Sequence, residues 1–480
     1  MKILKGPLKV QYTMKLPKIS CFHYNGNDLR GIKNMREQKH YIVANGTIID
    51  VENSNSFTGS IEIQESKIKT IFLPNQMLPE GIPVIDAKGK YIIPGLIDMH
   101  CHIQELYAPH FLASGVTTVR NTAGNVFMIK NLIDAPIDAP TPRVYSADRM
   151  IDGTPGQWGP TSSGNLVTDD PEEARMEVRR QAAAGVKFIK AYGWINRNVM
   201  EAVVNEAKKY DLEVSCDLIH SKDLNALDAA QIGVTWFEHA SGFAQALYQG
   251  WYPRADQTQW EHLNWEEPDE RKIKDLCQQM IAYNVKLCPT LIIFDQIDKS
   301  PQVWDPKNII TESLEKEHIL IGHWRNMSEY QEQLKQQFAK LNQFTKVVAK
   351  TYFDLGGTVV TGTDSPALIW TFPGMAIHRE MELFVEMGFS EMETLQAATV
   401  NAAKSIQLEN VGSIKKGNIA DLVLLNNDPL ENIQHTQDIY YVIKGGKVYS
   451  QEEILKHIPS QAYVDKQLSE FEKEWEAMEK

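Results

Sequence analysis

Eight short apolar segments alternate with helical stretches across the middle of this chain, and each segment is expected to form a β-strand. The segments cover residues 91–98, 115–121, 142–148, 186–192, 212–218, 234–240, 285–291 and 357–364. This alternation is typical of a parallel α/β domain, and eight strand-helix units over about 270 residues match a (β/α)₈ TIM barrel. A doubly wound open sheet is the alternative, although no GxGxxG motif follows an early strand.

Helix signals lie between several of these strands. Asp170, Pro171 and two glutamates read as an N-cap, a proline at the first helical position and an acidic first turn, and Gly185 ends that helix. Further helices are expected at 198–210, 221–233, 311–355 (two helices) and 463–480.

Alternating strands also occur near both ends of the chain, at 40–50, 59–72, 420–425 and 440–449. Asn45-Gly46 predicts a hairpin turn, and Gly445-Gly446 interrupts the last run. We expect both ends to build one small β-sandwich domain together. The predicted division is an N-terminal extension (1–38), the sandwich (39–90 and 408–450), the barrel (91–407) and a C-terminal helical tail (451–480).

Composition limits the class of partner and the compartment. Acidic residues outnumber basic ones by 62 to 49, so the net charge of -13 disfavours nucleic acid and anionic membranes and favours a small-molecule substrate. The five cysteines are scattered without a CxxC pair, which fits a reducing cytoplasm. No signal peptide or 18-residue apolar run is evident, so we expect a soluble cytoplasmic protein, and a homo-oligomer is compatible with the sequence.

Polar side chains gather where the predicted strands end. His100 and His102 lie two residues apart, so they face the same way while Cys101 faces the other. Lys190, His239 and Asp364 fall near the ends of three further strands. Each has an ordinary structural explanation, such as a surface lysine, a core histidine or a helix cap. Together, at one rim of a barrel, they predict a metal site.

Several motifs together resemble the amidohydrolase superfamily, in its imidazolonepropionase-like and Xaa-Pro-dipeptidase-like branch. The resemblance covers about residues 40–450 and rests on Pro94–His102, Ile189-Lys190, Glu238-His239, Gly362–Asp364, Val411–Asp421 and Asn427–Leu430. It implies a binuclear centre, usually of zinc, with Mn²⁺, Fe²⁺ or Co²⁺ as other candidates. It also implies a (β/α)₈ barrel that carries this centre.

The resemblance also implies which residues bind the metals. His100, His102 and Asp364 would hold one ion, two further histidines would hold the other, and a Lys190 carboxylated by carbon dioxide would bridge both. His239 is one of the further histidines. On the fifth strand the family has a histidine, but ungapped registration places Asp217 there, whereas residue type favours His220. A carboxylate is a competent zinc ligand, so both stay open.

The resemblance implies hydrolysis of a C–N bond by a metal-activated hydroxide. Asp364 would accept the proton of the hydroxide and pass it to the leaving nitrogen. Tyr192 faces the same way as Lys190 and could stabilise an oxyanion or hold a substrate carboxylate, and ordinary packing explains it equally well. Arg120 could bind a substrate carboxylate, with a structural ion pair as the alternative. His110 and His378 are expected to be structural.

Three other functions compete with amide hydrolysis. A mononuclear deaminase would use His100, His102, His239 and Asp364 without a bridging lysine, and Lys190 argues against it. Ester, lactone or phosphotriester hydrolysis would use nearly the same centre. A non-catalytic scaffold with a degenerate site is the third, since the fifth strand departs from the family. Substrate contacts are expected in long loops such as 241–270, whose aromatic residues serve equally well to pack the loop.

Overall fold

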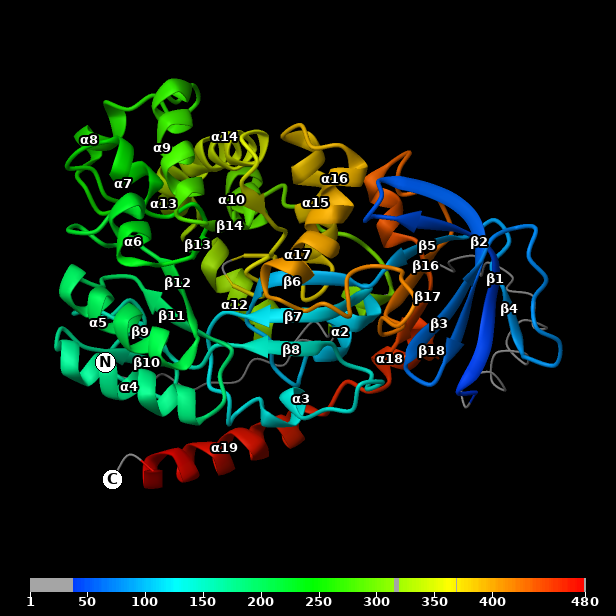
Figure 1. Ribbon diagram of the computed structural model, residues 1–480. Coiled ribbons are helices and arrows are strands. Elements are labelled where there is room, and N and C mark those ends of the chain that lie inside the picture. The colour runs from blue at the N-terminus through cyan, green and yellow to red at the C-terminus, as the bar shows by residue number, and fades with distance from the viewer. Residues whose placement is uncertain (1–37, 315–318, 368, 479–480) are drawn as a thin grey trace, which may run out of the picture.

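The computed structural model describes residues 38–314, 319–367 and 369–478. All but the last residue of the expected N-terminal extension (1–38) lies outside these ranges. Figure 1 shows a mixed sheet at one end of the molecule and two parallel sheets with helices around them in the remainder. Within the described residues, no helix is both long and apolar enough to cross a membrane.

Both ends of the described chain contribute to the mixed sheet. Its strand order is β18-β17-β16-β5-β1-β2-β3, with β4 also paired to β1. The strands are β1 (His40–Asp50), β2 (Asn55–Gln64), β3 (Lys67–Phe72), β4 (Val84–Asp86), β5 (Tyr91–Pro94), β16 (Leu422–Leu425), β17 (Ile439–Lys444) and β18 (Lys447–Tyr449). Apolar side chains from both ends, including Ile61 and Leu422, pack into one buried cluster.

The predicted hairpin turn at Asn45-Gly46 is wrong. β1 runs through both residues, and its pairing with β2 shifts register between Val43 and Gly46, which marks a β-bulge. Asn45 adopts a φ of +64°, a backbone conformation that asparagine tolerates in bulges as well as in turns. The strand continues because β1 also pairs in parallel with β4 before the bulge and with β5 beyond it.

The predicted α/β class with parallel strands is confirmed. One parallel sheet has the order β6-β7-β8 and the other β10-β9-β11-β12-β13-β14-β15. Their strands are β6 (Leu96–Cys101), β7 (Val116–Asn121), β8 (Arg143–Ser146), β9 (Met150–Asp152), β10 (Asn165–Val167), β11 (Phe188–Tyr192), β12 (Glu213–Asp217), β13 (Trp236–Glu238), β14 (Lys286–Cys288) and β15 (Thr358–Val359). Seven of the eight predicted segments each contain one of these strands, and the first (91–98) contains β5 and the first residues of β6, which continues to Cys101.

Backbone hydrogen bonds join the two parallel sheets at both edges. At one edge, the amide of Lys187 donates to the carbonyl of Ser146 at 2.8 Å. This hydrogen bond links the start of β11 to the end of β8. At the other edge, the amide of Met99 donates to Thr361 at 3.0 Å, and that of His102 donates to Ser365 at 2.8 Å. The segment after β15 therefore runs beside β6, the strand that carries both histidines.

Helices surround the parallel strands and connect them (Figure 1). The predicted helix after residue 170 is α4, and the Asp170 side chain caps it by accepting a hydrogen bond from the amide of Glu172. The helices are α2 (Ala108–Ala113), α3 (Lys130–Ile133), α4 (Pro171–Ala183), α5 (Arg197–Ala207), η1 (Lys208–Tyr210), α6 (Ala226–Ile232), α7 (Phe243–Leu247), α8 (Gln257–Glu261), α9 (Glu270–Ala282), α10 (Leu291–Lys299), α11 (Ile309–Glu312), α12 (Ile319–Ser328), α13 (Gln331–Leu334), η2 (Lys335–Ala339), α14 (Lys340–Asp354), α15 (Ala376–Glu386), α16 (Glu391–Ala397), α17 (Val400–Ser405), η3 (Ile433–Gln437), α18 (Gln451–Leu455) and α19 (Gln461–Met478).

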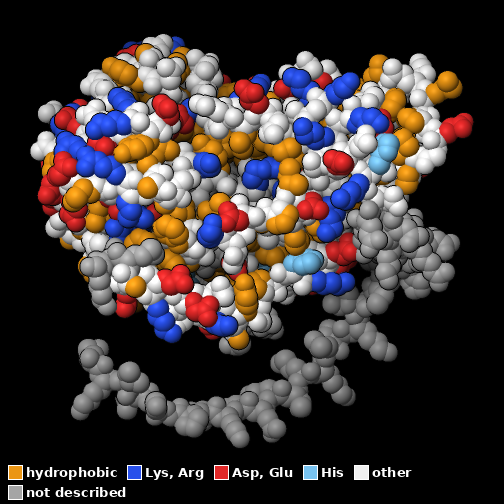
Figure 2. All heavy atoms as spheres, turned by 60° about the horizontal axis from the view of Figure 1, so that its bottom comes forward, with side chains coloured by type: hydrophobic (Ala, Val, Ile, Leu, Met, Phe, Trp, Pro, Cys, Tyr) orange, Lys and Arg blue, Asp and Glu red, His pale blue; other side chains and the backbone are white. Residues whose placement is uncertain are grey.

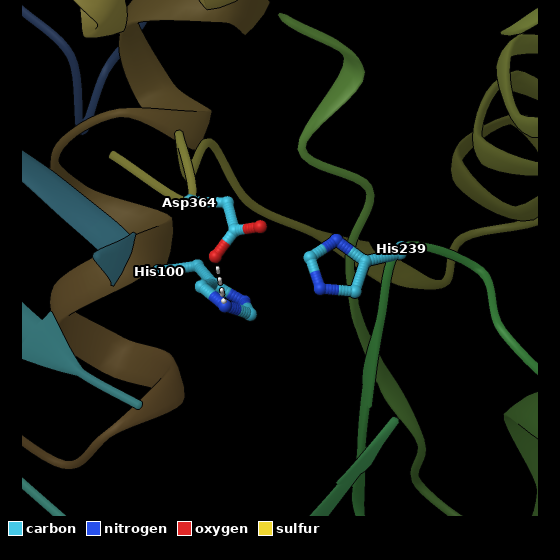
Figure 3. Close-up of side chains that lie close together, drawn as sticks. All are labelled: His100, His239 and Asp364. Carbon is cyan, nitrogen blue, oxygen red and sulfur yellow. Dashed lines mark ion pairs between the residues drawn. The ribbon is translucent and has the colours of Figure 1, made fainter. Parts of the chain in front are cut away.

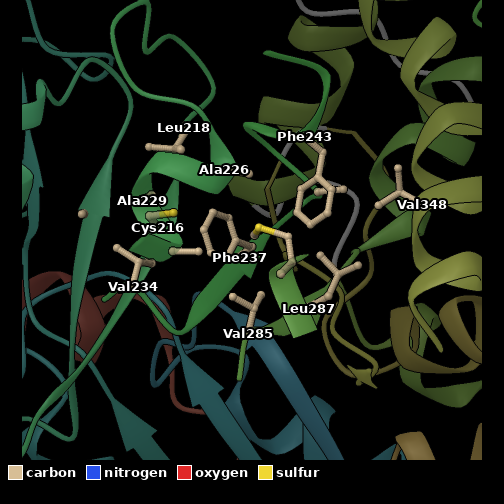
Figure 4. Close-up of a cluster of buried hydrophobic side chains, with 14 of the residues drawn as sticks. Cys216, Leu218, Ala226, Ala229, Val234, Phe237, Phe243, Val285, Leu287 and Val348 are labelled. Carbon is tan, nitrogen blue, oxygen red and sulfur yellow. The ribbon is translucent and has the colours of Figure 1, made fainter. Parts of the chain in front are cut away.

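The largest core cluster lies between the parallel strands and these helices. Figure 4 shows Phe237 of β13 and Leu287 of β14 among side chains from neighbouring helices, including Val348 of α14. Burying a side chain of this size stabilises the fold by roughly 1.5–3 kcal/mol. Because side chains alternate along a strand, Phe237 on the helix side leaves its neighbour Glu238 facing the other side. Likewise Ile189 and Ala191 pack in this cluster, so Lys190 between them faces the opposite way.

On the outer surface, charges of both signs are mixed. Figure 2 shows Lys and Arg side chains interspersed with Asp and Glu over one face, without a continuous patch of a single sign.

Candidate metal centre

Six of the predicted ligand residues line one cavity of about 610 Å³. They come from the ends of three strands and the segments after two others: His100 and, one residue past the strand, His102 (β6), Lys190 (β11), Asp217 (β12), His239 (after β13) and Asp364 (after β15). These residues are spread over positions 100 to 364 of the sequence, and the parallel strands bring their carboxyl ends to one edge. Tyr192 also lines this cavity.

His100, His239 and Asp364 form the tightest group of donors. One ligand atom from each lies within 4.8 Å of the others, and Figure 3 shows both rings beside the Asp364 carboxylate. Nε2 of His100 lies 3.1 Å, and Nε2 of His102 2.8 Å, from the same Asp364 oxygen. Burial alone would raise the pKa of the Asp364 carboxyl, but His100 and His102 hold it well below its usual range.

The backbone at this group is itself unusual. His239 has a φ of +59° and Asp364 a φ of +55°, the left-handed region that non-glycine residues rarely adopt. Such conformations persist where the surrounding structure imposes them, and they are concentrated at functional sites. Nδ1 of His239 also contacts the Thr290 hydroxyl, which fixes the ring orientation. Burial lowers the pKa of His239 to about 3, so the imidazole is neutral and able to bind a metal.

Glu238 orients the His100 ring through a hydrogen bond with Nδ1. Nδ1 of His100 donates a hydrogen bond to Oε2 of Glu238 at 2.7 Å, while Arg120 donates to Oε1 at 2.8 Å. Burial would raise the pKa of Glu238, but Arg120 and His100 hold it well below its usual range. Because Nδ1 of His100 donates to Glu238, Nε2 is the ring nitrogen that faces Asp364 and would be available to a metal.

Arg120 does not line the cavity. Its side chain is 1% exposed and lies against the rings of Phe188 and Trp236, with its guanidinium carbon 4.0 and 4.3 Å from their centroids. Its hydrogen bonds go to Glu238 and to the carbonyl of Met99. The structure therefore places Arg120 as the partner of Glu238 and away from any position where a substrate carboxylate could bind.

Lys190 is buried without a hydrogen-bond acceptor among the described residues. Its side chain is 1% exposed, and Nζ lies 5.8 Å from the centre of the Tyr192 ring. A buried ammonium without a partner is costly, whereas a carbamate formed with carbon dioxide would turn this side chain into an anionic oxygen ligand. The orphaned Lys190 Nζ therefore fits the bridging role.

Asp217 lies at the cavity and His220 does not. Oδ2 of Asp217 is 3.7 Å from Nε2 of His239, and Oδ1 has no hydrogen-bond donor among the described residues. Burial raises the pKa of Asp217 to about 6, although Lys190 opposes this shift. The His220 ring instead lies 4.8 Å from that of Trp194, outside the cavity lining, and burial together with Arg254 lowers its pKa to about 4.

Two further residues near the centre had no predicted role. Glu238 belongs to the Glu238-His239 motif, but no role was predicted for it from the sequence. The one available signal was an acidic residue within an otherwise apolar strand, which indicates a buried charge that needs a partner. Cys288 of β14 lies in a second compact group with His100 and Glu238. Burial raises the pKa of the Cys288 thiol well above its usual value, so it is a neutral packing group there.

The model of the Amidohydrolase family matches residues 91–449. This chain belongs to the amidohydrolase family. The matched range begins with β5 and ends with β18, so it contains every residue of the candidate metal centre. The predicted amidohydrolase resemblance is thereby confirmed.

Curated relatives of this amidohydrolase match only part of it. Ochratoxinase from Aspergillus niger is 25% identical over 334 residues, which are 65% of this chain and 55% of that protein. An adenine deaminase from Rhizobium meliloti is 32% identical over 127 residues, 24% of this chain and 21% of that protein. The chain thus spans about half the length of the first relative that it matches.

Solved structures with the same fold cover nearly the whole chain. A putative prolidase from Bifidobacterium longum has a TM-score of 0.63 at 22% identity and covers 90% of this chain and 98% of that one. The crystal structure of Aspergillus niger ochratoxinase has a TM-score of 0.60 at 19% identity, with 85% and 95% covered. At these identities the likeness establishes the fold.

Proposed function

We propose that this chain is a metal-dependent amidohydrolase that cleaves the C–N bond of a small-molecule amide. The observation that carries the proposal is the convergence of His100, His102, Lys190, His239 and Asp364 on one cavity. Membership of the amidohydrolase family supports it. So do the printed names of the matched proteins, among them ochratoxinase and bottromycin amidohydrolase.

The two parallel sheets support a closed eight-stranded barrel as the scaffold. In sequence order the ring would be β6, β7, β8 and β11 to β15, closed by the hydrogen bonds of Lys187 with Ser146 and of Met99 with Thr361. Active sites of such barrels lie at the carboxyl ends of the strands, where the candidate metal centre is found. The mixed sheet at the other end would be the small β-sandwich domain.

The donor set fits two divalent ions, with zinc the first candidate. His100, His102 and Asp364 would hold one ion and His239 with Asp217 the other, because imidazole nitrogen and carboxylate oxygen are both common zinc ligands. A carboxylated Lys190 would contact both, since its Nζ is buried beside Asp217 and faces the cavity. His220, stacked on Trp194, is left out of this assignment.

When bound, the metals would lower the pKa of a water molecule and polarise the scissile carbonyl. Asp364 would accept the proton of the attacking water and deliver it to the leaving nitrogen. The neighbouring His100 and His102 keep this carboxylate ionised, so its oxygens can accept a hydrogen bond from the attacking water. Burial raises the pKa of Tyr192 well above its usual value, so its hydroxyl remains a donor and could hold the developing oxyanion.

Metal-dependent hydrolysis is the direct test. The purified chain, loaded with Zn²⁺ or Mn²⁺, should release amine from at least one member of a panel of dipeptides, N-acyl amino acids and N-acyl amines. Asp364→Asn should lower kcat by at least about 100-fold, because proton transfer is lost. Asp354→Asn, which alters an exposed partner of Lys350, should leave kcat unchanged.

Two results would contradict the proposal. If no compound of the panel is turned over in a metal-dependent way, amide hydrolysis is rejected, and the hypothesis of a non-catalytic scaffold is favoured. Release of ammonia from aminated ring compounds, with about one metal ion per chain, would instead identify a mononuclear deaminase.

A further inference from the structure

The cavity at the candidate metal centre has two chemically different linings. One is the polar set at the strand ends. The other, here called the apolar wall, comes from α10, α12, η2 and α14. It consists of Ile293, Phe294, Leu320, Phe338, Leu341 and Phe344.

The apolar wall is anchored in the core. Phe344 is 1% and Phe294 3% exposed, and the Phe344 ring lies 5.7 Å from that of Trp265. The first turn of α10 is fixed because Glu380 accepts hydrogen bonds from the amides of Leu291 and Ile292 at 2.9 and 2.8 Å. A wall held this way is a preformed surface for an apolar group.

Trp251 extends this apolar surface from the long loop after α7. Its side chain lines the cavity and is 5% exposed. Its ring packs against Trp260 and Trp265, with centroids 4.9 and 5.0 Å away. Trp260 and Trp265 therefore pack the loop, as the sequence suggested, while Trp251 lines the cavity, where it could contact a substrate.

The charges of the lining are unfavourable for an anionic substrate. Among the described residues that line the cavity, Lys190 is the only lysine or arginine, and its charge acts on Asp217 and His239 of the candidate metal centre. Arg120 is held behind Glu238. Outside the group at the strand ends, the His323 imidazole of α12 is the only basic side chain among the described residues of the lining. A substrate carboxylate lying along the apolar wall would thus lose its hydration without a lysine or arginine to pair with, which is unfavourable.

We infer that the substrate is an uncharged amide with a bulky aromatic or alkyl group that lies against the apolar wall, and not a dipeptide or another amide bearing a free carboxylate. This inference rests on the proposed function and narrows its substrate class. The amide would reach the polar lining, where water attacks the carbonyl carbon and the C–N bond breaks to give a carboxylic acid and an amine.

A matched pair of substrates tests this class. N-phenylacetyl-2-phenylethylamine and N-phenylacetyl-phenylalanine differ only in one carboxylate. The zinc-loaded chain should cleave the uncharged amide with a kcat/KM at least about 100-fold higher, because burial of an unpaired carboxylate is costly. Equal values, or a preference for the carboxylated compound, would overturn the inference and leave amide hydrolysis intact.

Binding gives a second readout that needs no turnover. Ketone analogues, in which a methylene group replaces the amide nitrogen of each substrate, can be compared by calorimetry. The uncharged ketone should bind at least about 100-fold more tightly than the carboxylated one. If neither these amides nor any compound of the panel is cleaved, the proposed function fails. The two dissociation constants then decide the inference separately, and equal or reversed affinities would reject it.

Leu341 offers a variant that separates charge from packing. It is half-buried on α14 and lines the cavity, so a longer polar side chain can be accommodated there. Leu341→Lys should raise the relative kcat/KM for the carboxylated amide by about tenfold or more, because it supplies the missing cation. Leu341→Gln, similar in size and uncharged, should not. An equal shift in both variants would count against the inference.

Discussion

Nδ1 of His100 donates a hydrogen bond to Glu238 at 2.7 Å, across a separation of 138 residues in sequence. Both side chains are almost fully buried, at 2% and 0% exposure. Arg120 forms an ion pair with the other oxygen of Glu238, and this pair offsets the desolvation cost of burying the carboxylate. The candidate metal centre thus includes a chain of three buried, hydrogen-bonded residues, of which His100 alone is a proposed ligand.

Replacing Glu238 should weaken metal binding without removing a ligand. Glu238→Gln keeps the size of the side chain but loses the charge that orients the His100 proton, so the Kd for zinc should rise about 10- to 100-fold. Competition with a chromophoric chelator would measure it. The exposed Glu472→Gln serves as the control and should bind zinc like the unaltered protein. An unchanged Kd in a correctly folded Glu238→Gln protein would refute this role.

Lys190 should determine the number of metal ions. We expect about two ions per chain in the unaltered protein, and one or fewer in Lys190→Met, because the bridging ligand is missing. Elemental analysis after dialysis would give both numbers, and isotopically labelled bicarbonate should mark Lys190 only in the unaltered chain. Lys187→Met, at an exposed position three residues away, should retain both ions. Two ions in Lys190→Met would rule out the bridge.

The fifth-strand ligand can be identified with a pair of variants. Asp217 faces His239 at the cavity, whereas His220 stacks on Trp194. Asp217→Asn should therefore lose about one metal ion per chain, because a neutral amide is a poor zinc ligand. His220→Gln should keep both ions. The reverse result would assign the ligand to His220, as its residue type alone suggested.

The order of strands and helices could be predicted because the signals are local. Apolar runs mark β7, β8 and β11 to β15 within a few residues, and Asp170 begins α4 as its capping pattern indicates. The convergence of the candidate ligand residues on one cavity could also be predicted, since strand ends on one rim must meet once the strands are parallel. The choice between Asp217 and His220 as the fifth-strand ligand could not be made from the sequence. A shift of a few residues after the strand decides which of the two side chains reaches the cavity.

Features that depend on distant contacts could not be predicted. The first predicted strand is split at Gly95, where an added Cβ would lie 2.2 Å from Thr117 Oγ1, and the chain passes there from the mixed sheet to β6. The bulge at Asn45 likewise follows from pairing with β4 and β5. From the sequence alone, Arg120 could bind a substrate carboxylate or form a structural ion pair. Only its contact with Glu238 in the folded protein identifies the ion pair.

His378 should make the fold less stable in acid. It is buried on α15 between the Thr436 hydroxyl and the Ser114 carbonyl, at 2.9 and 3.1 Å from its ring nitrogens. Burial lowers its pKa from 6.5 to about 4, so the folded protein keeps it neutral. Since the unfolded chain binds a proton first, stability is complete above pH 6.5 and falls as the pH drops from about 6.5 to 4, by about 3 kcal/mol in total.

Urea unfolding at neutral pH and at pH 5 would measure this effect. Between the two, the unaltered protein should lose about 2 kcal/mol that His378→Gln does not lose, because glutamine has no proton to bind. His378→Gln is less stable at neutral pH if the ring also contributes packing, but the slope with pH is the relevant quantity. His457→Gln, at an exposed position, should keep the slope of the unaltered protein. Equal slopes in His378→Gln and the unaltered protein would show that His378 is not the acid-sensitive group.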